Sequence, residues 1–244
     1  MSFRIVTYNV HKCRGLDRRV RPERMAAVLR ETQADVIALQ EVLSVEGRER
    51  ECHQARFIAE ELGMDYHVGE NRRLNGGAYG NVLLSRLPSQ MVRNYDITWS
   101  GRERRGCLRV DASLTEGRIL HVFNVHLGTA FLERRQQARQ LINGGILRQP
   151  EMNGARVVLG DFNEWTHGLA SRLLTQHFKS ADIHHHLRRG RTYPGLLPLV
   201  HLDHIYYDPS LVLESLTLHR SRTALVASDH LPLVADFHWR GPGS

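Results

Sequence analysis

The sequence predicts an α/β sandwich in which strands outnumber helices. Short β-type runs alternate with amphipathic segments, and about ten strand-like runs accompany only a few helices. Several of these runs are continuously apolar, as expected of strands that are buried on both faces. The chain has 244 residues and shows no repeat or low-complexity linker, so we expect one domain over residues 1–244.

The first half of the chain predicts two helices among the first strands. FRIVTYNV opens as a strand and DVIALQEV follows as a buried strand. Between them, residues 22–33 have apolar side chains on one helical face, and Pro22 lies in the first turn. Residues 53–62 form a second helix that ends at Gly63. The runs YHVG, YGNVLLS and QMVRNYDI then predict consecutive strands.

The second half continues with a hairpin, two helices and more strands. CLRVDASL and RILHVFNVHL pair across TEGR, and ARVVLGDF is another buried strand. Residues 131–148 form the longest helix, although Gly144 and Gly145 weaken its end, and residues 168–177 form a short one. Loop material covers residues 184–198, and LDHIYYD, LVLESLTLH and LPLVADFHW complete the strands.

The chain is basic, with a net charge of +7 and a pI of about 9.8. Lys12 and Lys179 are the only lysines among its 33 basic residues, so the others are arginine. Arginine binds phosphate oxygens in a bidentate manner, so an arginine-rich surface suits a polyanionic substrate or an anionic membrane surface. The arginines are spread along the chain without a dense tract, and codon composition explains them equally well.

Several features indicate a cytoplasmic protein. No stretch approaches the roughly 20 apolar residues of a membrane span, and MSFRIVTYNV does not resemble a signal peptide. The three cysteines, Cys13, Cys52 and Cys107, form no CxxC pair, which argues against a zinc knuckle or a disulfide framework. We expect a monomer with no stable membrane insertion and no obligate protein partner.

Polar side chains gather where the predicted strands end. They are Asn9, Glu41, Asn124, His126, Asp161 and Asn163. Residues two apart in a strand share a face, so the last two pairs of this set each point toward one site. In α/β sheets, ligands bind at the carboxyl ends of the strands. The sequence therefore predicts a functional site at this edge.

These residue types suit phosphoryl chemistry with a hard cation. Mg²⁺ prefers oxygen ligands and keeps several waters, so the carboxylates of Glu41, Asp161 and Asp229 with the amide of Asn9 suffice. Zinc would require more His or Cys. We expect Mg²⁺ as the cofactor, with Mn²⁺ as an alternative. Taken one at a time, such residues are also typical of turns and helix caps.

Eight segments, considered together, resemble the endonuclease/exonuclease/phosphatase (DNase I-like) superfamily, in particular small bacterial members. In order from Thr7 to Leu233 they are TYNV, LQEV, GNVLLSR, RRGCLRV, NVHLG, GDFNEW, LDHIYY and SDHLPL. GDFN and SDH are the most specific. The resemblance implies a four-layer sandwich of two mixed β-sheets packed face to face and flanked by helices. It also implies a metal-dependent hydrolase that cleaves a phosphodiester by in-line attack of water.

The resemblance also implies a role for each matching residue. Asn9 and Glu41 would hold the metal, with Glu41 as the direct ligand. Asp161 would activate the attacking water, and Asn163 would orient the water and the phosphate. Asp229 would support a second metal or the histidine that follows it.

Four further residues would act on the phosphate. His230 would contact the scissile phosphate, and Asp203 would pair with His230 and fix its tautomer. His126 would stabilise the transition state together with Asn124. Candidates to bind flanking phosphates are His11, Lys12, Arg14, Arg72, Arg73, Asn81, Arg102, Arg104 and Arg105.

Nucleic acid, DNA or RNA, is the substrate that the net charge favours. Candidates for base stacking are few, namely Tyr79, Trp99, Trp165 and Tyr193. A phospholipid or sphingomyelin phosphodiesterase and an inositol-phosphate phosphatase remain alternatives. A lipid enzyme would carry an exposed apolar hairpin, for which LLPLV at residues 196–200 is the candidate.

Two other interpretations stay open. A catalytically inactive scaffold would lack a member of the acid, amide and histidine set, and every member is present. The run His184–His186 could bind a metal, although consecutive residues of an extended loop do not all point one way. His167 lines the cleft or begins the next helix.

Overall fold

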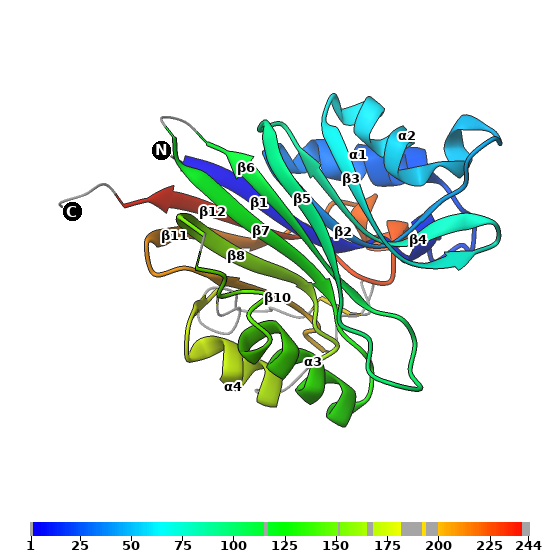
Figure 1. Ribbon diagram of the computed structural model, residues 1–244. Helices are drawn as coiled ribbons and strands as arrows, with labels where there is room; N and C mark the ends of the chain where they lie inside the picture. The colour runs from blue at the N-terminus through cyan, green and yellow to red at the C-terminus, as the bar shows by residue number, and fades with distance from the viewer. Residues whose placement is uncertain are drawn as a thin grey trace.

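Two six-stranded β-sheets lie face to face in the computed structural model of the chain (Figure 1). The structure describes residues 2–114, 117–150, 152–164, 168–181, 192–193 and 200–240. In spatial order, the first sheet contains β11 (Leu211–Leu218), β12 (Leu233–Trp239), β1 (Ser2–Asn9), β2 (Val36–Ser44), β4 (Gly77–Ser85) and β3 (Asp65–Leu74). The second contains β5 (Ser89–Asp96), β6 (Gly106–Ser113), β7 (Ile119–His126), β8 (Gly154–Asp161), β10 (Asp203–Tyr207) and β9 (Lys179–Ser180).

Each sheet is mixed because it contains one parallel pair among antiparallel pairs. In the first sheet β1 runs parallel to β2, and in the second β7 runs parallel to β8. Parallel neighbours require a crossover connection, which α1 (Pro22–Thr32) provides for the first pair and α3 (Phe131–Asn143) for the second. The carboxyl ends of the paired strands therefore meet at one edge of each sheet.

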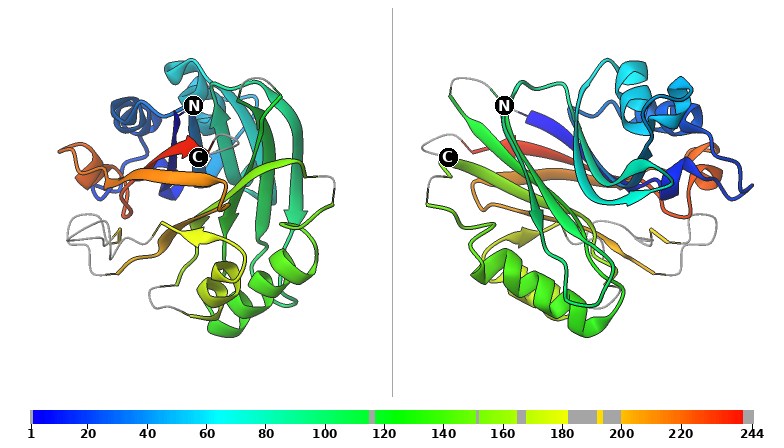
Figure 2. Two further views of the ribbon diagram at one scale, coloured as in Figure 1. Left: turned by 90° about the vertical axis from the view of Figure 1, so that its left-hand side faces the viewer. Right: turned by 45° about the vertical axis from the view of Figure 1, so that its right-hand side comes forward.

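Helices cover the outer face of each sheet (Figure 2). The helices α1 and α2 (Gln54–Leu62) lie on the first sheet, and α3 and α4 (Leu169–Thr175) lie on the second. Shorter elements are η1 (His11–Cys13), η2 (Arg50–Cys52) and α6 (Ala224–Ala227). The predicted four-layer α/β sandwich is confirmed. Across the part of the chain that is described, the helices lack the combined length and apolar character needed to cross a bilayer.

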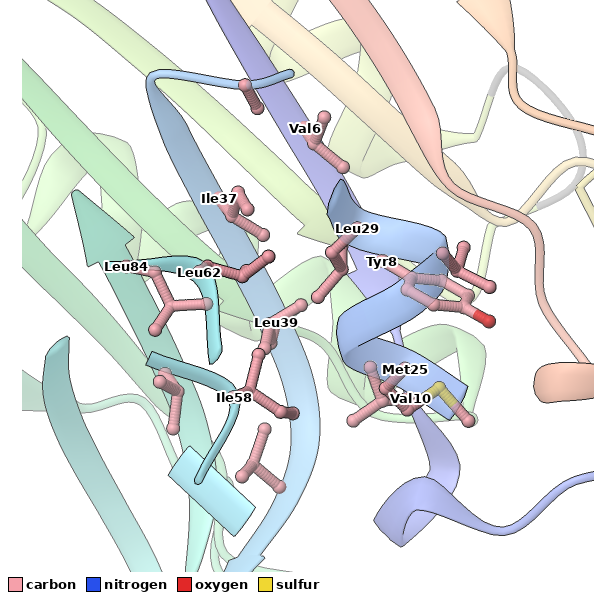
Figure 3. Packing of buried hydrophobic residues seen from close by; sticks show 14 of the residues in the cluster. Val6, Tyr8, Val10, Met25, Leu29, Ile37, Leu39, Ile58, Leu62 and Leu84 are labelled. Carbon is pink, nitrogen blue, oxygen red and sulfur yellow. The ribbon is translucent and has the colours of Figure 1, made fainter. Parts of the chain in front are cut away.

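Alternation along the strands builds separate apolar layers. Figure 3 shows the layer between the first sheet and its helices, in which Tyr8 and Leu39 pack against Met25 and Leu29 of α1. Their strand neighbours Ile5 and Ala38 turn the other way and join the core between the sheets. Full burial of a side chain such as Leu29 contributes about 1.5–3 kcal/mol, so these layers fix how the sheets stack.

The faces that bury apolar side chains between the sheets carry polar ones at the strand ends. In β8, Val157 and Leu159 belong to the core between the sheets, and Asp161 continues the same face. In β7, Val122 belongs to the same core and His126 continues its face. The site is therefore the polar end of the layer between the two sheets.

Some element boundaries differ from the sequence prediction. The helix expected over residues 131–148 ends at Asn143, because Gly144 follows as its C-cap and Gly145 adopts a left-handed φ of 75°. The strand expected at YHVG extends over all of β3. The two-residue β9 and the single turn of α6 have no periodic signal in the sequence.

Candidate active site

Contacts between the two sheets bring the strand ends together. At the end of β1, Asn9 donates from Nδ2 to Asp161 Oδ2 of β8 over 3.0 Å. One layer deeper, Gln40 of β2 donates from Nε2 to Asn124 Oδ1 of β7 over 2.8 Å. All four side chains are buried. These bonds hold the two halves of the site in a fixed relation, since buried polar groups need partners.

Glu41 reaches the site through a break in the strand pattern. The register between β2 and β4 shifts between Leu39 and Val42, and Glu41 adopts a left-handed φ of 58°. A bulge re-aims a side chain, and an unfavourable φ of this kind is retained where the surrounding structure over-determines it. The Glu41 carboxylate accepts from Asn9 Nδ2 over 3.3 Å and from Lys12 Nζ over 2.9 Å.

The charge of Glu41 is stabilised despite its burial. Burial raises the pKa of a carboxyl group, but the charge and hydrogen bond of Lys12 and the hydrogen bond from Asn9 hold the pKa of Glu41 well below its ordinary value. Glu41 therefore carries a negative charge at neutral pH. A partly accessible anionic oxygen donor of this kind suits a hard divalent cation.

The Asn9 amide lies between the carboxylates of Glu41 and Asp161 and donates to both, so it does more than offer one metal ligand. Its Oδ1 accepts the backbone N–H of His11 over 3.0 Å, so its Nδ2 faces the carboxylates of Glu41 and Asp161. Ser228 fixes the strand end, because its Oγ donates to the backbone oxygen of Asn9 over 2.8 Å. No role for Ser228 was predicted from the sequence, although it is the first residue of the SDH motif.

Asp161 lies at the centre of the site and is 2% exposed. Its Oδ1 accepts the backbone N–H of Asn163 over 2.9 Å. Its Oδ2 lies 3.6 Å from His126 Nε2 and 3.7 Å from His230 Nε2. Asn163 has a left-handed φ of 50°, and its Nδ2 donates to the backbone oxygen of Leu127. The turn after β8 is thereby fixed against the end of β7.

His230 forms a pair with Asp203. Its Nδ1 donates to Asp203 Oδ2 over 2.9 Å, and Asp203 stands directly opposite Asp161 in the β10–β8 register. Burial alone would lower the pKa of His230, but the charges of Asp203 and Asp161 raise it well above its ordinary value. His230 is therefore a cation at neutral pH, with its Nε2 directed at Asp161.

His126 has the opposite environment. Arg105 Nη1 lies 3.1 Å from His126 Nδ1 and 3.3 Å from His126 Nε2, and a guanidinium can only donate. The closer nitrogen, Nδ1, accepts, and Nε2, which is 3.6 Å from the Asp161 carboxylate, carries the proton, so the ring is neutral. Burial and then the charge of Arg105 lower the pKa of His126 to about 4. The Nε2–H of His126 then faces Asp161. Arg105 itself is held by Glu103 Oε2, to which its Nη2 donates over 2.9 Å.

Asp229 lies on the side of the site formed by the loop after β1. Its Oδ1 is 3.4 Å from His11 Nδ1 and 3.2 Å from Ser228 Oγ. Burial favours its neutral form, yet the hydrogen bond from His11 and the charge of His230 hold the pKa of Asp229 below its ordinary value. The structure thus places Asp229 beside both His230 and the turn that carries Lys12.

Two amides expected at the phosphate lie in the interior. Asn124 donates from Nδ2 to the backbone oxygens of Leu39 and Val82 and accepts from Gln40. Asn81, expected to bind phosphate, is fully buried and donates to the backbone oxygens of Gly106 and Asn124. Both assignments are corrected, because these amides join the sheets beneath the site. Gln40, which the sequence reasoning missed, belongs to the same network.

The basic candidates divide into two groups. Lys12 and Arg105 contact site residues directly. Arg14 and Arg104 are exposed, and Arg14 donates from Nε to the backbone oxygen of Arg18 in its own loop. Within the described part of the chain, neither Arg14 nor Arg104 contacts the acidic cluster, so a role for them depends on a long substrate.

Basic and aromatic side chains lie together beside Glu41. The Arg72 guanidinium is 4.8 Å from the centroid of the Tyr79 ring, and Lys12 Nζ is 5.7 Å from the same centroid. Arg102 lies over Trp99 at 5.9 Å. On the other side, the rings of Tyr193 and His230 are 5.0 Å apart. Trp165, His167, His184–His186 and most of the apolar run at residues 196–200 lie outside the described residues.

The donor set fits a magnesium ion. Among the described residues, no three His, Cys, Asp or Glu side chains converge to enclose a cation by themselves. Mg²⁺ does not need such an enclosure, since it is held by one or two carboxylates together with waters and substrate oxygens. The ionised Glu41 would be the direct ligand of such an ion, and Asn9 donates to its carboxylate.

Comparisons with known proteins agree with the geometry. A sequence model described as the Endonuclease/Exonuclease/phosphatase family matches residues 6–230. The uncharacterized protein YbhP of Escherichia coli is 34% identical over 254 residues, which cover 97% of this chain and 96% of YbhP.

Two solved structures have the same fold at low identity. A mannosyl-6-phosphatase from Bacteroides thetaiotaomicron superposes with a TM-score of 0.80 at 17% identity, covering 97% of this chain and 100% of that one. The catalytic domain of human Nocturnin, with a bound sulfate anion, superposes with a TM-score of 0.75 at 20% identity. That match covers 98% of this chain and 94% of the Nocturnin domain.

Proposed function

Because the chain belongs to the endonuclease/exonuclease/phosphatase family, whose members hydrolyse phosphate esters, we propose that it is a Mg²⁺-dependent phosphodiesterase acting on nucleic acid. The observation that carries the proposal is the position of Asp161 between a neutral histidine, His126, and a cationic histidine, His230, next to the ionised Glu41. Titratable groups whose pKa values are driven apart within one site are typical of acid–base catalysis.

Each side chain has a task in the attack of water on the phosphate. Asp161, oriented through both oxygens by Asn9 and the backbone of Asn163, accepts the proton of the attacking water. The imidazolium of His230, held by Asp203, stabilises the charge that develops on the phosphoryl oxygens. A magnesium ion held by Glu41 would add Lewis-acid stabilisation of the same charge.

His126 completes the polar wall on the opposite side. Its Nδ1 accepts from Arg105, so it offers an Nε2–H toward Asp161. A neutral donor positions the attacking water and a phosphoryl oxygen without neutralising the Asp161 carboxylate. The positive charge on this side of the site is that of Arg105, which acts through its contact with His126.

Nucleic acid is the substrate class that the rim of the site supports best. The net charge of +7 attracts a polyanion. Next to Glu41, Arg72 and Tyr79 lie together, and Arg102 pairs with Trp99 in the loop before β6. Basic and aromatic side chains in alternation bind the backbone and bases of single-stranded nucleic acid.

A phospholipid is the second candidate, because one rim of the site exposes apolar side chains. Leu16 and Val226 are each 41% exposed and Val20 is 58% exposed. Leu16 donates its backbone N–H to Val226, so the loop after η1 and α6 lie together. Exposed Arg18 and Arg19 flank these residues. Apolar and basic side chains in combination are typical of surfaces that contact anionic membranes.

The decisive experiment is hydrolysis across a substrate panel, with and without EDTA. The panel contains single- and double-stranded DNA, abasic duplex, RNA, anionic phospholipid vesicles, sphingomyelin and phosphoinositides. We expect Mg²⁺-dependent cleavage of nucleic acid and little turnover of lipid. Turnover of a phospholipid instead would retain the hydrolytic mechanism and replace nucleic acid as substrate.

Two variants test the assignment of the site. Asp161→Asn should lower kcat by roughly 10³-fold or more while the circular dichroism spectrum stays unchanged. Glu41→Ala should raise the Mg²⁺ concentration for half-maximal rate by at least about tenfold. Full activity of Asp161→Asn, or an unchanged Mg²⁺ requirement of Glu41→Ala, would contradict the proposed mechanism.

A further inference from the structure

The turn that follows β1 has an unusual backbone. His11, Lys12 and Cys13 have consecutive left-handed φ values of 44°, 57° and 56°. Each such residue other than glycine costs on the order of 1 kcal/mol, so a run of three requires support from its surroundings.

The support comes from the interior of the protein. The Cys13 side chain is fully buried in the layer beneath the helices, and its backbone oxygen accepts from Arg21 over 2.8 Å. Gln54 of α2 donates from Nε2 to the backbone oxygen of Lys12 over 2.8 Å. The backbone of the turn is thus fixed by hydrogen bonds, and two of its side chains point toward acidic residues of the site. These side chains are His11, toward Asp229, and Lys12, toward Glu41.

The Lys12 contact uses an oxygen that a cation would need. Lys12 Nζ lies 2.9 Å from Glu41 Oε2, and Asn9 Nδ2 takes Oε1. Both carboxylate oxygens therefore have donors. Each oxygen keeps a second lone pair, but a divalent cation bound to Oε2 would lie next to the Lys12 ammonium, and the two positive charges would repel each other. Of the two donors, the Lys12 ammonium is the one that leaves, because its charge repels the incoming cation and its side chain is mobile. Asn9 stays in place because it also donates to Asp161.

The choice of lysine at this position is itself informative. Lys12 is one of only two lysines among 33 basic residues. An arginine would grip the Glu41 carboxylate with a bidentate fork, whereas lysine is a point charge on a flexible stem and releases a carboxylate more easily. The Lys12 and Glu41 side chains are 31% and 20% exposed, so the ammonium can move aside toward solvent and the face of Tyr79.

We propose that Lys12 is a built-in, displaceable counter-ion of Glu41 that competes with the divalent cation and so sets the affinity of the site for it. The inference rests on the proposed Mg²⁺ dependence and deepens it. Lys12 neutralises a carboxylate that the strained strand end holds in place, and leaves it when the cation binds. The affinity of this protein for Mg²⁺ is therefore lower than Glu41 alone would give.

The test is direct measurement of Mg²⁺ and Mn²⁺ binding by titration calorimetry, without substrate. Lys12→Met should tighten Mg²⁺ binding by about two- to tenfold, as expected when a partly exposed ion pair no longer competes. Lys12→Arg should leave Mg²⁺ binding as weak as in the wild type or weaken it further, because a guanidinium can make two hydrogen bonds to the Glu41 carboxylate. The difference between Lys12→Met and wild type should shrink in 0.5 M KCl.

Lys179→Met is the matched control, since it removes the other lysine, which is exposed on β9, and should leave Mg²⁺ affinity unchanged. If Lys12→Met does not fold, as judged by thermal unfolding, Lys12→Asn carries the test, because asparagine tolerates the left-handed conformation. Equal or weaker Mg²⁺ binding by the folded Lys12 variant would overturn the inference.

Failure of the inference is distinguishable from failure of the proposed function. If the wild type binds Mg²⁺ and hydrolyses a diester while folded Lys12→Met or Lys12→Asn binds Mg²⁺ only as well as the wild type, only the role of Lys12 is overturned. If the wild type binds neither Mg²⁺ nor Mn²⁺ at millimolar concentration, both proposals are overturned together.

Discussion

His126 and His230 lie at nearly equal distances from Asp161 but in opposite electrostatic surroundings. Their Nε2 atoms are 3.6 and 3.7 Å from the same carboxylate oxygen, and both side chains are buried. Arg105 contacts His126, whereas Asp203 contacts His230. Burial lowers the pKa of each ring, so the neighbour decides which of them is charged.

The difference between these two rings separates their tasks. In the proposed mechanism, a cationic His230 stabilises negative charge on the phosphate, and a neutral His126 donates a hydrogen bond without carrying charge. If both rings were cations, Asp161 would be flanked by two positive charges. The Arg105 guanidinium helps to keep His126 neutral and so leaves Asp161 with one cationic neighbour ring.

The largest effect should come from removing the charged ring. We expect His230→Ala to lower kcat by about 10³- to 10⁴-fold, because the positive charge at the phosphate is lost. Single-turnover hydrolysis at saturating Mg²⁺ measures this loss. A decrease of less than tenfold would mean that His230 does not contact the reacting phosphate.

Removing the partner of the charged ring should have the next largest effect. Asp203→Asn keeps the shape of the side chain but removes the negative charge that raises the pKa of His230. We expect a roughly 10²- to 10³-fold lower kcat near pH 8. Activity should also fall at a lower pH on the alkaline side, because His230 loses its proton earlier. A pH–rate profile with an unshifted alkaline limb would contradict this account.

Replacing the neutral ring should cost less. His126→Ala removes one hydrogen-bond donor and no charge, so we expect kcat to fall by about 10- to 10²-fold. The comparison between the rings would be broken if His126→Ala were as damaging as His230→Ala. Thermal unfolding of both variants provides the control, since both rings are buried.

The smallest expected effect concerns stability. The pKa of His126 is depressed to about 4 in the folded state, so between pH 6.5 and 4 the unfolded chain binds more protons. Stability therefore falls as pH falls through this window, by on the order of 1 kcal/mol between pH 6 and 5. Urea unfolding should show that His126→Gln loses this part of the pH dependence. Arg105→Met should reduce it, and an unchanged pH slope in both variants would contradict the depressed pKa.

Part of the site is readable from short-range pattern. In β7 and β8 the two-residue period places His126 and Asp161 on the faces that carry Val122 and Leu159 into the core. Because the period of a strand is fixed by backbone geometry, polar residues that continue an apolar face must lie at the end of that buried layer. For this reason the sequence could predict that these polar side chains gather at the strand ends, where the structure brings them together.

Other parts depend on contacts that no local pattern encodes. Asn81 and Asn124 look like site residues in the sequence, yet their amides are used between the sheets. The bulge that turns Glu41 into the site exists because β2 and β4 pair out of register there. Such features arise from how the sheets meet, which a single strand does not specify.

The sequence by itself determined an α/β sandwich rich in strands and the set of acids, amides and histidines at the strand ends, because alternation and chain order encode them. The four-layer arrangement was implied by the resemblance of the eight ordered segments to a known family. Only the tertiary structure decided which histidine is charged. Arg105 and Asp203 come from separate segments of the chain, and each becomes the neighbour of its ring only after β6, β7 and β10 have assembled. The electrostatic environment of each ring depends on which charges lie near it in space, so it is established only after the strands have packed together.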